Sequence, residues 1–109
     1  MRITITARHT EIDDDLRTHA RELVEKVSKL VRRALHAQVT FTEDAGLAAV
    51  EIAVHAPRGR TYVAKGQESD HRSALDGAIG RLKRQLLDEK ESPRPRRARR
   101  SAPKVSGPR

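Results

Sequence analysis

The chain has 109 residues, with 23 Lys and Arg, 15 Asp and Glu, and no cysteine. This length suits one small domain, and the lack of cysteine excludes a disulfide scaffold and thiolate chemistry. No apolar run exceeds four residues, whereas roughly 20 are needed to span a bilayer. Polar residues also interrupt the start of the chain, where a signal peptide would be apolar. We therefore expect a cytoplasmic protein with no membrane partner.

The net charge of +8 is concentrated near one end of the chain. Residues 92–109 contain seven basic side chains, four prolines and no acid, whereas residues 1–91 hold 16 basic and 15 acidic side chains. A segment of the first composition cannot bury enough apolar surface to offset its ordering entropy. We predict a folded domain over 1–91 and a disordered basic tail or linker over 92–109. The tail residues expected to add electrostatic attraction are Arg94, Arg96, Arg97, Arg99 and Arg100.

The first part of the chain predicts a strand followed by a helix. Apolar and polar residues alternate over 2–8, which is typical of a strand with one buried face. Three aspartates at 13–15 then provide an N-cap and negative charge for a helix start. Apolar residues recur every three or four positions from Leu16 to Ala34, so we predict one amphipathic helix across this whole segment.

The remainder predicts three strands and a second helix. Alternation returns over 38–43, 48–56 and 61–66, and a turn at 57–60 joins the last two segments. Leucines and an isoleucine then follow a helical period from the cap at Asp70 until Pro93. The predicted fold is α+β with the order β-α-β-β-β-α. Its first two strands are parallel and the rest antiparallel, in one four-stranded sheet with both helices on one face.

No motif indicates catalysis or cofactor binding. The chain lacks a Gly-x-Ser-x-Gly elbow, a phosphate-binding loop and a dinucleotide fingerprint. Its five histidines are spread over different predicted elements, without the spacing of a metal site. The aspartates at 13–15 could hold a cation, but a helix start explains them better. We expect no enzymatic activity, catalytic residue, cofactor or metal.

Both predicted helices carry basic side chains away from their apolar faces, so together they could present a ridge to RNA phosphates. The helix macrodipole alone also favours acids at a helix start and bases at its end. The charge pattern therefore leaves RNA binding and a solvated surface equally open. The candidate RNA-binding residues are Arg17, Arg21, Lys26, Lys29, Arg32 and Arg33 from the first helix and Arg72, Arg81, Lys83 and Arg84 from the second.

Recognition by base stacking is not expected. RNA-binding sheets of that kind need two or three exposed aromatics, and Phe41 and Tyr62 are the only Phe and Tyr in the chain, with Phe41 in phase with the core. Gly77 and Gly80 match the Gly-x-x-Gly loop of another RNA-binding module. They lie inside a continuous helical pattern of leucines, however, so we predict a helix there and not a loop. Any RNA contact should therefore be made to phosphates and sugars.

Six short motifs follow one another in a characteristic order. They are Ile3-Thr4-Ile5-Thr6, Glu11-Ile12 ahead of Leu16-Arg17, Pro57-x-Gly59, Ala64-x-Gly66, Asp70 with Ala74-Leu75-Asp76, and Arg81-Leu82-x-Arg84-Gln85-Leu86. Each motif is weak alone, but their register over residues 1–91 resembles the ribosome hibernation-promoting factor and protein Y family. His71-Arg72 departs from the Met-Tyr that is usual there.

The resemblance implies the same β-α-β-β-β-α fold and a function. Members of that family bind the small ribosomal subunit between head and body, where they compete with mRNA and tRNA and inhibit translation during stress and stationary phase. Basic residues on their helices contact ribosomal RNA. By position this role falls on Arg17, Lys26, Lys29, Arg81 and Arg84, and the other candidates depend on the helical wheel.

Two other functions fit the charges without the resemblance. One is a protein-interaction module that regulates transcription, and the other is a general double-stranded RNA-binding domain.

For the ribosome-binding function, the expected partners are the small-subunit RNA and the intact ribosome, and we expect a monomer away from the ribosome.

Overall fold

The computed structural model describes residues 1–91, with side chains described up to Asp88, so the predicted tail lies outside the described residues. The four strands and two helices follow one another in the predicted order. In chain order the elements are β1 (Arg2–Ala7), α1 (Asp14–Ser28), β2 (His36–Asp44), β3 (Leu47–His55), β4 (Thr61–Glu68) and α2 (His71–Glu91).

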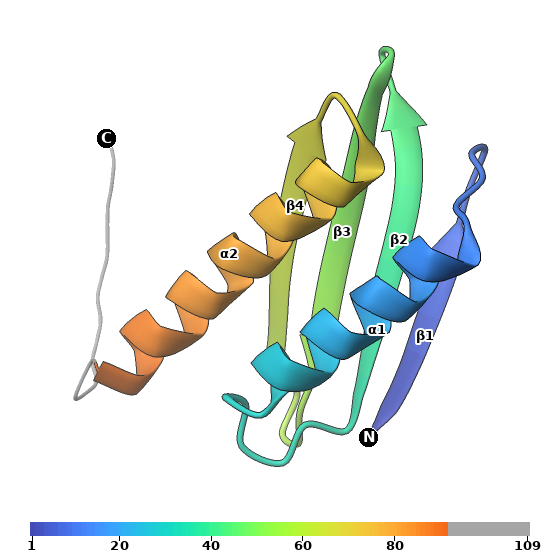
Figure 1. The fold of residues 1–109 in the computed structure, drawn as a ribbon. Coiled ribbons are helices and arrows are strands. Elements are labelled where there is room, and N and C mark those ends of the chain that lie inside the picture. Colours follow the sequence, from blue (N-terminus) through green and yellow to red (C-terminus); the bar gives the residue numbers. More distant parts are fainter. Residues whose placement is uncertain (92–109) are drawn as a thin grey trace.

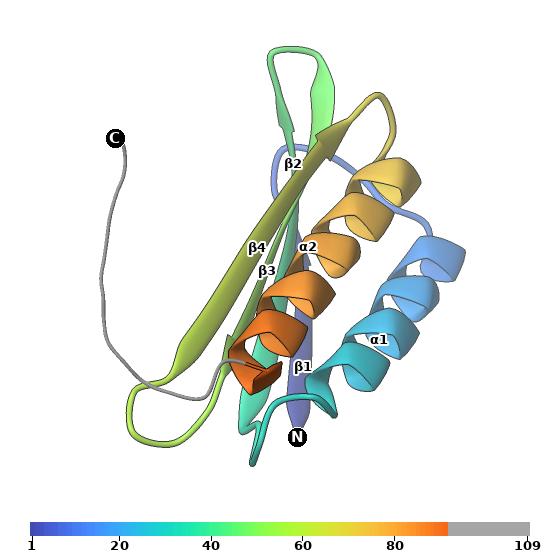
Figure 2. The same ribbon diagram turned by 90° about the vertical axis from the view of Figure 1, so that its left-hand side faces the viewer.

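The strands form one sheet in the order β1-β2-β3-β4. β1 pairs with β2 in parallel, whereas the β2–β3 and β3–β4 pairs are antiparallel. Figure 1 and Figure 2 show both helices on the same face of this sheet, running in nearly the same direction. The predicted fold class is therefore confirmed.

The core lies between the helices and the inner face of the sheet. Strand residues alternate between this face and the open face, so that Val39 and Phe41 of β2 and Ile52 of β3 are fully buried. The helices contribute Val24 and Leu82, which are also fully buried. The two-residue period of the strands and the helical period of the leucines thus meet in one apolar layer.

Gly66 allows α2 to pack closely against β4. A Cβ atom at this position would overlap the carbonyl oxygen of Ala74 and lie 2.8 Å from the backbone nitrogen of Ala78. Both atoms belong to the backbone of α2, which cannot move aside as a flexible side chain could. Glycine is therefore required here by the distance between helix and strand.

The first helix ends earlier than predicted, at Ser28 instead of near Ala34. Leu30 and Val31 donate backbone hydrogen bonds to Val27 and Ser28, three residues back, which tightens the last turn. Val31 is still buried and Ala34 half-buried, although both lie in the loop after α1. Their packing on the core explains why the apolar spacing continues beyond the end of the helix. The helical-wheel positions of Arg32 and Arg33 were therefore wrong.

Within residues 1–91, neither helix is long and apolar enough to cross a membrane.

Candidate RNA-binding surface

Two of the predicted RNA-binding arginines lie on the flank of α1 that faces β1. The Nη1 atom of Arg17 donates a hydrogen bond to the carbonyl oxygen of Ile5 at 3.2 Å, and Nη1 of Arg21 donates to that of Ile3 at 3.4 Å. β1 is an edge strand, so these carbonyls have no neighbouring strand to bond. Arg17 and Arg21 therefore cover the polar edge of β1.

Arg81 does the same at the opposite edge of the sheet. Its Nη1 atom donates a hydrogen bond to the carbonyl oxygen of Lys65 in β4 at 2.8 Å. A guanidinium has five N–H donors in a planar fork. One bond to the sheet therefore leaves donors on Arg81 that can still reach a phosphate oxygen.

A shallow groove of about 340 Å³ runs between the two helices. Its floor is apolar and its rims are cationic, with Lys26 on α1 and Lys83 on α2, both exposed. The groove is lined by Leu23, Lys26, Val27, Leu30, Ile79 and Lys83. The basic residues of the helices thus form two flanks and a central groove, and not the single ridge that the charge pattern indicated.

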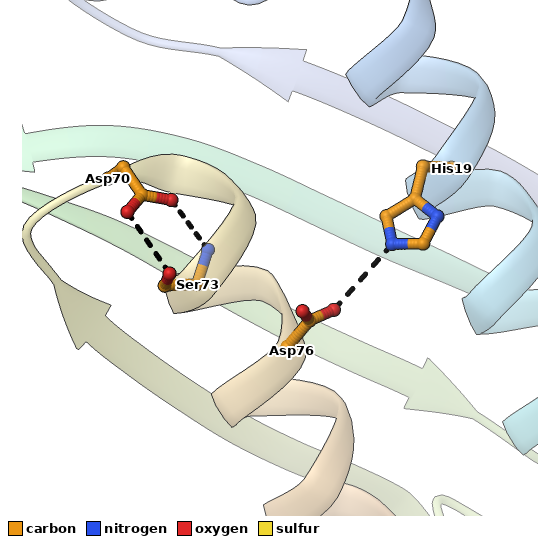
Figure 3. A network of polar contacts seen from close by, with 4 residues as sticks. All are labelled: His19, Asp70, Ser73 and Asp76. Atoms are coloured by element: carbon orange, nitrogen blue, oxygen red, sulfur yellow. Dashed lines mark hydrogen bonds and ion pairs between the residues drawn. The ribbon is translucent and has the colours of Figure 1, made fainter.

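Nearer the start of both helices, a polar contact joins them. His19 Nε2 of α1 lies 3.6 Å from Asp76 Oδ1 of α2 (Figure 3). Figure 3 also shows Asp70, whose carboxylate accepts hydrogen bonds from the backbone N–H of Ser73 at 2.8 Å and from its hydroxyl at 3.0 Å. These bonds lower the pKa of Asp70 from its ordinary value of 3.8, the backbone bond most of all. Asp70 is thus the N-cap that the sequence predicts for α2.

The other predicted residues are spread over the length of the domain. Lys29 caps the end of α1, and Arg32 and Arg33 follow it in the loop to β2, both exposed. Arg84 is exposed on α2, whereas Arg72 is exposed on the first turn of that helix, at the other end of the molecule. The structure therefore brings Lys29, Arg32 and Arg33 together and leaves Arg72 apart from them.

The sequence prediction missed cations in the strands and hairpins. Arg58 and Arg60 lie in the β3–β4 hairpin, and Arg2 opens β1. The helical-wheel argument could not include them, because they belong to no helix. The sequence nevertheless indicates that these segments are basic, since residues 26–42 and 52–67 contain no acidic side chain.

The open face of the sheet does not offer an array of stacking aromatics. Phe41 and Tyr62 are both buried, as expected for Phe41 from its phase. The imidazole rings of His36 and His55 instead stack on each other at one end of this face, with their centroids 4.3 Å apart. This arrangement agrees with recognition of RNA through phosphates and sugars.

Comparison with known proteins identifies the family of this chain. The model of the family described as "Sigma 54 modulation protein / S30EA ribosomal protein" matches residues 3–94, most of the chain. The chain belongs to this family. Membership in the Sigma 54 modulation protein / S30EA ribosomal protein family confirms the resemblance inferred from the six motifs. A comparison with curated proteins finds no match.

Two solved structures share the fold of this S30EA family member. The N-terminal domain of Thermus thermophilus protein Y is 26% identical, with a TM-score of 0.69, and the match covers 82% of this chain and 99% of that one. A ribosomal subunit interface protein from Coxiella burnetii is 24% identical, with a TM-score of 0.67, and the match covers 84% of this chain and all of the other. The family consists of ribosome-associated factors and is not a known class of enzyme, which supports a ribosome-related role.

Proposed function

We propose that this protein is a ribosome hibernation factor that binds the small subunit in the channel for mRNA and tRNA, and thereby inhibits translation under stress. The proposal rests on family membership together with one observation. The predicted RNA-binding residues of α1 and α2 place cations on both flanks of the helical layer and on the rims of the groove between the helices.

This charge arrangement suits folded RNA better than a single strand. Cations on two sheet edges and on a central groove are spread across the whole helical side of the domain, so they can meet phosphates of more than one RNA segment. The domain itself fills the space between these segments. Inhibition then needs no reaction, because mRNA and tRNA cannot occupy a passage that the folded domain already fills.

Charge reversal on the groove rims tests the binding surface. Lys26→Glu with Lys83→Glu removes two phosphate contacts, each of which contributes about 0.7–0.9 to the slope of log affinity against log salt. Taking 1 M as the concentration at which this term vanishes, two contacts correspond to about 25- to 60-fold in affinity at 0.1 M salt. We expect at least this loss when co-sedimentation with purified small subunits is measured.

Arg8→Glu with Lys65→Glu is the matched control. Both side chains are exposed on the open face of the sheet, away from the groove between the helices, and the change in net charge is identical. Equal weakening of both variants would show that net charge alone is involved, and would contradict a binding surface on the helices.

Competition separates the proposed site from general RNA binding. Small subunits loaded with a short mRNA and a tRNA should bind the protein much more weakly than empty subunits do. Unrelated duplex RNA in excess should not displace the protein from empty subunits. Undiminished binding to loaded subunits would rule out the decoding channel, and displacement by any duplex would indicate a general double-stranded RNA-binding domain.

A further inference from the structure

Three separate segments meet at one end of the molecule: the start of β1, the α1–β2 loop and the β3–β4 hairpin (Figure 1). The backbone N–H of Arg2 donates to the carbonyl of Leu35 at 3.3 Å, and the N–H of Leu35 donates to that of His55 at 2.8 Å. The side chain of Arg60 completes the junction. Its Nη2 donates to the carbonyl of Arg32 at 2.8 Å and its Nε to that of Pro57 at 3.2 Å. The loop and the hairpin are thus fastened to each other.

This end, which we name the basic end, carries more cations than acids. No acidic residue occurs within 1–10, 26–42 or 52–67, although Glu25 lines a pocket there with Lys29, and α2, which contains Asp88, ends on the same side (Figure 1). Its basic residues are Arg2, Lys29, Arg32, Arg33, Arg58 and Arg60.

The opposite end of the molecule has the opposite charge. It comprises the β1–α1 loop with the start of α1, the β2–β3 hairpin and the β4–α2 turn (Figure 1). Its acidic residues are Glu11, Asp13, Asp14, Asp15, Glu43, Asp44, Glu68 and Asp70. The domain is therefore polarised along its strands.

Helix dipoles explain only part of this polarity. They account for acids at the starts of α1 and α2 and for Lys29 at the end of α1. They cannot account for Arg58 and Arg60, which belong to a hairpin between two strands. The strand dipoles of a sheet nearly cancel, so nothing in the backbone favours cations at that hairpin.

The backbone at two of these arginines also favours a different residue. Arg33 and Arg58 have φ angles of 61° and 68°, in the left-handed region. Residues other than glycine rarely adopt this region, and asparagine adopts it several times more readily than most. Arg58 is followed by Gly59 at φ 72°, a turn in which Asn-Gly is the preferred pair. Arginine at both positions is thus unexplained by local conformation.

We propose that the basic end is a second phosphate-binding site, in which Arg33 and Arg58 bind the sugar–phosphate backbone of small-subunit RNA. The inference rests on the proposed function and adds a site outside the helices. Arginine suits this role because its planar fork can bond two oxygens of one phosphate. Arg60 holds the two loops together, so that both exposed arginines project from one connected surface.

The test replaces both arginines by the residue that their backbone prefers. Arg33→Asn with Arg58→Asn should leave the unfolding midpoint unchanged or higher, while affinity for purified small subunits falls about 25- to 60-fold at 0.1 M salt. The slope of log affinity against log salt should decrease by about 1.4–1.8. Arg33→Lys with Arg58→Lys keeps the charge but cannot bond two oxygens of one phosphate, so it should keep the salt slope of the unchanged protein and bind with an affinity between those of the unchanged protein and the asparagine variant.

Arg8→Gln with Lys65→Gln, at exposed positions away from the basic end, lowers the net charge equally and should bind as the unchanged protein does. If the asparagine variant also binds normally, while Lys26→Glu with Lys83→Glu is weakened, the basic end is not a binding site and the proposed function stands. Equal weakening of the asparagine variant and the glutamine control would reduce the effect to net charge and overturn the site. If the unchanged protein shows no preference for small subunits, both proposals fail.

Discussion

The same substitution, glycine to alanine, should have opposite effects at two positions in contact with or within α2. At Gly66 in β4, an added Cβ would overlap the backbone of α2 at Ala74 and crowd that of Ala78. At Gly80, inside α2, an added Cβ would meet no atom within 4 Å. The first change therefore forces a helix away from the sheet, and the second only removes backbone freedom from the unfolded chain.

The expected magnitudes follow from these surroundings. Gly80→Ala should raise the free energy of unfolding by about 0.5–1 kcal/mol, the usual difference between the two residues inside a helix. Gly66→Ala should lower it by at least about 1–3 kcal/mol, the usual cost of overpacking, because the obstructing atoms are backbone. Near the midpoint, 1 kcal/mol corresponds to a shift in Tm of about 4–8 °C for a domain of this size.

Thermal and urea unfolding followed by far-UV circular dichroism can measure both variants, since the chain has no tryptophan for fluorescence. Gly77→Ala serves as a second stabilising control, because its Cβ would also meet no atom within 4 Å. A Gly66→Ala variant as stable as the unchanged protein would refute the close packing of α2 on β4. A destabilised Gly80→Ala variant would show that the surface of α2 is not open there.

Two further predictions concern the sheet edge and the cap of α2. Arg17→Ala with Arg21→Ala uncovers the carbonyls of the β1 edge and should increase concentration-dependent self-association in light scattering, because an open edge can pair with another chain; a strictly monomeric variant would show that these arginines do not protect the edge. Asp70 has a lowered pKa in the folded state, so its stabilising effect is complete above its ordinary pKa of 3.8 and disappears as the pH falls through the lower folded value. Asp70→Ala should accordingly lower the Tm at neutral pH, with a difference from the unchanged protein that shrinks in acid, and a pH-independent difference would contradict this.

The order of the elements was predictable because each has a clear period in the sequence. The end of α1 was not, since Val31 and Ala34 keep the helical spacing although they pack from a loop. Apolar spacing reports which residues are buried, and burial does not require the backbone to remain helical. A backbone hydrogen bond three residues back, as at Val31, leaves no trace in that spacing.

The candidate site was predictable only where it follows a helix. The wheel placed Lys26 and Lys83 outside the apolar faces, and both are exposed. It could not show that Arg81 bonds a strand edge, because that contact depends on how α2 crosses β4. The basic end was equally hidden, since Arg33 and Arg58 are far apart in the sequence and only the topology brings their loops together.

The two helices differ in length, and this difference determines where the chain leaves the domain. α2 has 21 residues and α1 has 15, which correspond to about 31 Å and 22 Å. Figure 1 shows the last turns of α2 extending past β4, beyond the edge of the sheet. Among the residues whose side chains are described, Leu86 is the last of α2 in the core cluster, and the helix continues for five residues to Glu91. A fusion partner attached there would start clear of the sheet and could vary in size without disturbing the packing beneath the helices.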